Sequence, residues 1–167
     1  QALSEAIAHF REGETESRRT GGKLWSVFAT ACDVSEERYL KLIVARLATY
    51  LQIPGYGEAL VNVNGWDMDT LKSFRSAPIV AGMTGAIDSV ASYAELAEIE
   101  KLIPQEWRPA AVGDAKTCAQ RWLDQFNAGA DGIIIHASTP EEFAPVLAEY
   151  ERIRPAELFV QRTNRPG

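Results

Sequence analysis

The sequence is poor in the residues that build disulfide frameworks and metal sites, since its 167 residues include two cysteines and two histidines. Neither Cys32 nor Cys118 stands in a CxxC or zinc-ligand spacing, and both have apolar neighbours, which predicts free, buried thiols in a reducing cytoplasm. No apolar run reaches the roughly 18 residues that a membrane span needs, and no signal-peptide pattern opens the chain. These absences exclude a disulfide scaffold and predict a cytoplasmic chain with no membrane partner.

Positive charge is also scarce, with 17 Lys and Arg against 23 Asp and Glu and a net charge of -6. A net negative charge does not favour binding to the phosphate backbone of a nucleic acid, so we expect no nucleic-acid partner. The sequence contains no GxGxxG, Walker, HExxH, GxSxG or EF-hand pattern, which removes several enzyme classes. The hydrophobic content of 46% and charged content of 24% are typical of a globular protein with a packed core.

Two short apolar segments rich in β-branched residues predict strands. The first is LWSVFATAC at 24–32, and the second is GIIIH at 132–136. Nearly continuous apolar runs of this kind are typical of parallel strands that are covered on both faces. Two strands do not make a stable sheet, so we expect partner strands from elsewhere.

Amphipathic helices are predicted on both sides of each strand. Their expected ranges are about 2–12, 36–51, 79–90, 93–104, 114–129 and 140–152. Asp33 or Ser35 can cap the second of these helices, and Thr139 followed by Pro140 and Glu142 gives the sharpest helix start in the chain. The order is therefore helix, strand, helix, helical insert, helix, strand, helix.

This order is typical of a (β/α) barrel or a doubly wound sheet. Because the chain opens on Gln1 inside a helical pattern and has few strands, we predict an α/β fold that is the C-terminal portion of a TIM-type (β/α)8 barrel. It would be mostly helical with two or three parallel strands. The partial barrel would span 1–153 with a helical insert at about 53–112, and a tail would follow at 154–167. The alternative is that several copies assemble and complete one another's sheets.

Candidate binding residues cluster where the two predicted strands end. His136 ends the second strand, at the side where barrel active sites are built, and its imidazole suits a cofactor ring or a substrate oxygen. Ser138 and Thr139 follow at a helix start that favours a phosphate, although capping of that helix also explains both residues. Cys32 and Asp33 hold the equivalent place after the first strand, where Asp33 is also a candidate cap.

Aromatic residues gather near the start of the predicted insert. Tyr50, Tyr56 and Trp66 could wall a flat ring system, and packing within the insert is the alternative interpretation. No residue is assigned a catalytic role.

Several segments become informative together: PGYGEAL after ATYLQI, the following NGWD, and AAVGDAKTCAQRWLDQFNAGADGIIIH with TPEEFAPVL behind it. In combination they resemble the C-terminal part of the luciferase-like monooxygenases, a family of flavin- or deazaflavin-dependent oxidoreductases. In that family a VG precedes a helix, AGADG leads into the last barrel strand, and a capped helix closes the ring. The resemblance covers about residues 1–153, and its most specific piece is 129–145.

The resemblance implies a barrel whose seventh and eighth strands are 24–32 and 132–136, with flavin mononucleotide (FMN) or the deazaflavin coenzyme at the carboxyl rim. It implies hydride transfer, or monooxygenation with oxygen in flavin members, on a small-molecule substrate, commonly in a homodimer. The rim contacts it implies are His136 and Ser138 after the last strand, Cys32 and Asp33 after the one before, and Tyr56 near the ring.

The first six strands of such a barrel have no counterpart in this chain. We therefore expect the chain to be inactive alone and to need the remainder of the barrel. One alternative is a non-catalytic half-barrel that self-associates or pairs with another chain through its open strand edges. Another is an unrelated α/β binding domain.

Overall fold

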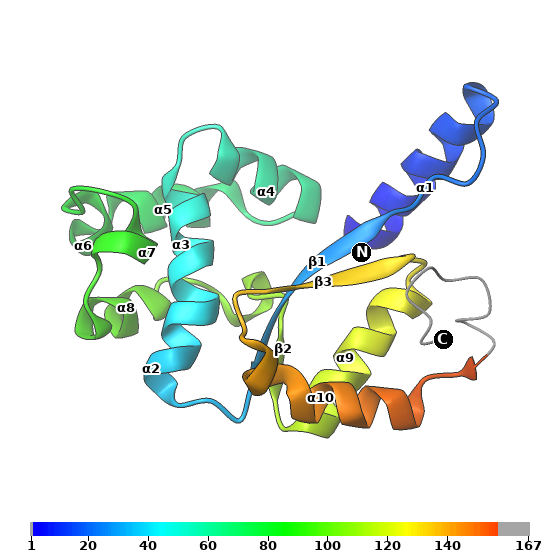
Figure 1. Ribbon diagram of the computed structural model, residues 1–167. Coiled ribbons are helices and arrows are strands. Elements are labelled where there is room, and N and C mark those ends of the chain that lie inside the picture. Colours follow the sequence, from blue (N-terminus) through cyan, green and yellow to red (C-terminus); the bar gives the residue numbers. More distant parts are fainter. Residues whose placement is uncertain (1, 157–167) are drawn as a thin grey trace. The chain divides into compact units, whose positions relative to one another are not determined.

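A computed structural model describes residues 2–156 and shows an α/β protein that is mostly helical, with one small parallel sheet (Figure 1). The chain divides into two compact units, one of residues 1–33 with 111–167 and the other of residues 34–110. The tail prediction lies outside the described residues from 157 onward. Within residues 2–156, no helix is long and apolar enough to cross a membrane.

The first unit holds the whole sheet. Its elements are α1 (Ala2–Glu16), β1 (Trp25–Cys32), β2 (Ala111–Gly113), α9 (Ala115–Asn127), β3 (Gly132–His136) and α10 (Pro140–Ile153). Both predicted strands are confirmed, and β2 is a third. The strands are parallel in the order β2-β1-β3, so β1 lies in the middle. In the register, Trp25 to Ala29 pair with β3, whereas Thr30 to Cys32 pair with β2.

The two faces of this sheet differ in cover. Phe28, Thr30 and Cys32 of β1 are buried on the face where α9 and α10 pack, below the strands in Figure 1. The alternate residues face the other way, and Val27 is 61% and Ile134 49% exposed. The prediction of strands buried on both faces is therefore wrong. The apolar run is continuous in the sequence, but these two helices cover only one side of the pleat.

The start of α10 confirms the cap predicted at Thr139, and Asp114 caps α9. The Asp114 carboxylate accepts a hydrogen bond from the Thr117 N–H at 2.7 Å. The Thr139 hydroxyl accepts from the Glu142 N–H at 3.3 Å, and the Glu142 carboxylate accepts from the Thr139 N–H at 2.8 Å. Each cap satisfies backbone donors that the helix itself cannot pair.

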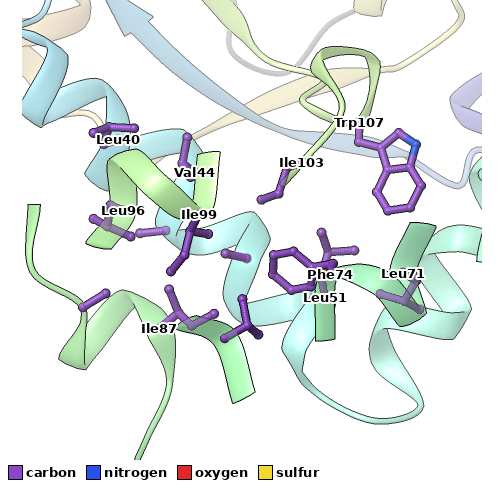
Figure 2. Close-up of a cluster of buried hydrophobic side chains, with 14 of the residues drawn as sticks. Leu40, Val44, Leu51, Leu71, Phe74, Ile87, Leu96, Ile99, Ile103 and Trp107 are labelled. Carbon is purple, nitrogen blue, oxygen red and sulfur yellow. The ribbon is translucent and has the colours of Figure 1, made fainter. Parts of the chain in front are cut away.

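The second unit is a bundle of short helices. Its elements are α2 (Glu36–Tyr39), η1 (Leu40–Val44), α3 (Ala45–Gln52), α4 (Tyr56–Asn64), α5 (Met68–Ser76), α6 (Pro78–Ala81), α7 (Ile87–Val90), α8 (Tyr93–Glu100) and η2 (Gln105–Trp107). The first three run on from one another and form the predicted helix 36–51, with a π-helical segment at η1. Leu40, Val44 and Leu51 of this helix point into a core shared with Phe74 and Ile99 (Figure 2).

Of the two candidate caps for the helix that starts at 36, Ser35 is the one used, because its side chain accepts from the Arg38 N–H. Two local predictions in this unit need correction. The predicted helix 79–90 is two helices, α6 and α7, because the glycine-containing stretch 82–86 does not continue the turn. The predicted helix 93–104 is capped by Ser92 and ends at Glu100.

Candidate functional site

The three parallel strands end at one edge of the sheet, which we call the carboxyl edge. It comprises residues 32–33 after β1, 113–114 after β2 and 136–139 after β3. The Asp33 N–H donates to the Gly113 carbonyl at 3.0 Å, which joins the first two of these segments. The Ser138 hydroxyl donates to the Thr30 carbonyl, which joins the third to β1. Five of the six predicted binding residues therefore meet here, whereas Tyr56 belongs to the second unit.

The backbone turns sharply where each strand ends. Asp33 has a φ of 47° and Ala137 a φ of 67°, and Gly113 has a φ of 129°. A side chain at positive φ costs on the order of 1–3 kcal/mol, so the first two turns are held by their surroundings against a local cost. Such positions are concentrated at functional edges of α/β sheets.

Ser138 and Thr139 are both engaged within the chain. The Ser138 hydroxyl donates to Thr30, as described above, and Thr139 forms the reciprocal cap with Glu142. The capping interpretation thus accounts for what these two side chains do. A phosphate at the start of α10 would have to displace the Glu142 carboxylate from its backbone partner.

Acidic side chains dominate the charge of the carboxyl edge. Hydrogen bonds from the backbone and then the side chain of Thr117 lower the pKa of Asp114. Hydrogen bonds from its own N–H and then from Thr139 lower the pKa of Glu141. Both groups are therefore ionised at neutral pH and oppose an anion. Lys116 and the first N–H groups of α9 are the features that favour one.

His136 lies on the face of the sheet opposite α9 and α10, at its carboxyl end. Its strand partner is Ala29, and Ala31 pairs with Val112 two residues further along β1. Val112 is 43% exposed and Ala29 is half-buried, whereas Ala31 is buried with an exposed fraction of 2%. The surface beside His136 on this face is therefore that of Ala29, and a planar ring there would lie next to an imidazole.

Cys32 and Cys118 are free and buried, as predicted, but the sequence did not indicate that they meet. Burial is the main cause that raises the pKa of Cys32, and burial also raises the pKa of Cys118 to about 12. The Cys118 Sγ lies 3.7 Å from the carbonyl oxygen of Gly113, the register partner of Cys32, so the two side chains are neighbours. Their separation of 86 positions hides this contact from any local motif.

The aromatic residues of the second unit pack against one another. Tyr56, the first residue of α4, is 49% exposed and lies 4.8 Å from Tyr50 between ring centroids. Trp66 stacks on the buried Trp107 at 4.7 Å with an interplanar angle of 8°. Trp66 therefore packs within the second unit, whereas the ring of Tyr56 remains exposed.

Among residues 2–156, no cluster of three His, Cys, Asp or Glu side chains could hold a metal ion. No protein-family model, no curated protein and no solved structure matches the chain. What the fold and the edge define is an α/β protein with a three-stranded parallel sheet. Its carboxyl edge carries an imidazole, two capped helix starts and a buried pair of thiols.

Proposed function

We propose that the chain is a segment of a flavin- or deazaflavin-dependent oxidoreductase of the luciferase-like kind, and that its carboxyl edge forms part of the cofactor site. The observation that carries the proposal is the one-sided cover of the sheet. In a (β/α)8 barrel, helices cover the outer face and the inner face is filled by apolar side chains from the other strands. Val27 and Ile134 have the exposure and the apolar character of such inner-face residues.

The pairing of β1 also supports a larger sheet. β1 and β3 are neighbours although β2 lies between them in the sequence, and β2 takes the other edge of β1 over only three residue pairs. Among the described strands, none pairs with that edge of β1 along 25–29. In a complete barrel the strand before β1 would pair there. The order β2-β1-β3 means that this strand would share the edge with β2 or displace it.

The residues at the edge suit part of a flavin-type cofactor. Ala29 pairs with His136 in the sheet, so a flat ring lying on this alanine would have an imidazole beside its polar atoms. Lys116 stands in the first turn of α9, whose first N–H groups favour a phosphate. When bound, FMN or the deazaflavin supplies hydride transfer, and this chain binds and orients it.

The test uses the full-length product of the reading frame that encodes this chain. We expect the purified protein to show the visible absorbance of a flavin or deazaflavin and to be reduced by a hydride donor. His136→Ala should weaken cofactor binding about tenfold, the effect of one hydrogen bond of roughly 1–1.5 kcal/mol. His9→Ala, at an exposed position of α1, is the matched control and should bind normally. A colourless protein that binds neither cofactor would overturn the proposal.

A non-catalytic half-barrel that self-associates is the second candidate. The observation that favours it is the exposed apolar face together with the open edge of β1. Exposed strand edges and apolar patches favour pairing with another copy. Light scattering on the purified chain tests it. A tight oligomer that binds no flavin would support this candidate, and a stable monomer would exclude it.

A further inference from the structure

The packing of β1 on α9 brings the two cysteines together by simple geometry. Thr30 and Cys32 lie two residues apart on one face of β1, which is about 6.6 Å along a strand. Cys118 and Trp122 lie four residues apart on one face of α9, which is about 6 Å along a helix. The Trp122 indole N–H donates to the Thr30 hydroxyl at 2.9 Å. Because Cys32 is about as far from Thr30 as Cys118 is from Trp122, this hydrogen bond places Cys118 beside Cys32.

The contacts of the sulfur atoms agree with this placement. The Cys118 Sγ lies 3.7 Å from the carbonyl oxygen of Gly113 and 4.0 Å from that of Ala31. Gly113 is the residue that pairs with Cys32 in the parallel ladder. Cys118 is completely buried, whereas Cys32 retains 8% of its surface. Cys32 is thus the member of the pair that a small molecule reaches first.

We propose that Cys32 and Cys118 form an oxidisable dithiol that a low-molecular-weight disulfide, such as oxidised glutathione, converts into an intrachain disulfide. The Cys32 thiolate attacks one sulfur of the small disulfide and releases one thiol, which leaves a mixed disulfide on Cys32. The Cys118 sulfur then gives up its proton and attacks the Cys32 sulfur, which releases the second thiol. Two protein thiols are oxidised and one small disulfide is reduced to two thiols.

The bond would close a chain segment that contains all of residues 34–110, because that unit is inserted between Cys32 and Cys118. It would also fix the end of β1 to α9 at the carboxyl edge. The inference stands on this contact alone and is independent of the proposed cofactor. Since burial raises the pKa of Cys32, the thiolate is scarce at neutral pH. The reaction should be slow and should accelerate about tenfold per pH unit in mildly alkaline buffer.

The test is incubation of the folded chain with oxidised glutathione, followed by acid quench, alkylation and intact-mass measurement. We expect the wild type to lose two hydrogens and two alkylatable thiols, with little mixed disulfide remaining. Cys118→Ser should stop at one glutathione on Cys32. Cys32→Ser should react at least about tenfold more slowly, because Cys118 is the shielded sulfur.

The urea-unfolded wild type is the control that needs no substitution. In the unfolded chain the two cysteines are far apart. The ratio of mixed disulfide to intrachain disulfide should therefore be about tenfold higher than in the folded protein. The proposal is overturned if the folded wild type accumulates a stable mixed disulfide or forms only intermolecular bonds. It is equally overturned if folded and unfolded chains give the same ratio of products.

Discussion

The indole N–H of Trp122 donates a hydrogen bond of 2.9 Å to the hydroxyl of Thr30, and both side chains are buried, with exposed fractions of 4% and 1%. This contact ties the middle strand of the sheet to α9. It explains why a threonine stands at a fully buried position of the covered strand face. A buried indole N–H without a hydrogen-bond partner would lose its hydrogen bonds to water and form none in the protein, which is destabilising.

Replacement of Thr30 by valine should therefore destabilise the protein by roughly 1–3 kcal/mol, although the two side chains have nearly the same shape. Urea unfolding followed by tryptophan fluorescence measures the change. In a Trp122→Phe background the donor is gone, so Thr30→Val should cost at least about 1 kcal/mol less there. Additive effects of the two substitutions would show that the hydrogen bond contributes nothing.

Gly132 is required by the ring of Trp25 opposite it on the neighbouring strand. A Cβ at position 132 would lie 2.4 Å from a ring carbon of Trp25, and the two residues are register partners. We expect Gly132→Ala to displace the indole, lower the urea midpoint and shift the fluorescence maximum. In a Trp25→Leu background the same substitution should cost much less. An equal loss in both backgrounds would show that the strand backbone, and not the ring, excludes the methyl group.

Stability of the second unit should depend on acid through Glu58. The hydrogen bond from Arg75 is the main cause that lowers the pKa of Glu58 from 4.5 to about 2, and the Gly55 N–H also donates to it. A carboxylate with a lowered pKa in the folded state stabilises that state above pH 4.5 and loses this contribution as the pH falls towards 2.

Glu58→Gln should accordingly be less stable than the wild type at pH 7, and the two unfolding curves should converge as the pH falls from about 4.5 to about 2. Glu98→Gln is the matched control, because the Glu98–Lys101 pair lies in the open with exposed fractions of 60% and 66%. That variant should track the wild type at every pH. A constant difference between Glu58→Gln and the wild type across this range would contradict the assignment.

The exposed face of the sheet allows a test of whether this face is the interior of a barrel. Val27 is 61% exposed, so Val27→Asp should change the stability of this chain by no more than about 1 kcal/mol. Under the proposed function, the same position in a longer protein would lie inside a barrel, where a buried carboxylate is severely destabilising. Phe28→Asp, which points to the covered face, should unfold both forms. A Val27→Asp variant that is equally well folded in the full-length product would exclude this face as a barrel interior.

Local signals in the sequence predicted much of the first unit. The strands over 25–32 and 132–136 and the cap of α10 follow from β-branched runs and from Thr, Pro and Glu at fixed offsets. The strand β2 has only three residues and acquires its structure from pairing with β1, so no local pattern marks it. Burial of one strand face and not the other depends on which helices return to the sheet, which is a tertiary property.

At the site, the sequence found the end of each long strand but not the roles of the residues there. Serine and threonine are good helix caps and also good phosphate ligands, so the sequence could not distinguish the two roles for Ser138 and Thr139. In the structure, Thr139 caps α10 and Ser138 donates to a backbone carbonyl. The contact between Cys32 and Cys118 depends on the register between a strand and a helix. Only the packed structure sets that register, through contacts such as Thr30 with Trp122.

The central claim, that this chain belongs to a flavin- or deazaflavin-dependent oxidoreductase, is tested most directly by the cofactor content of the full-length product. The purified protein is denatured, and the released small molecules are identified by their absorption spectrum and mass. We expect FMN or the deazaflavin coenzyme, close to one per protein chain after saturation with added cofactor. A full-length protein that releases neither, and that acquires neither after incubation, would contradict it.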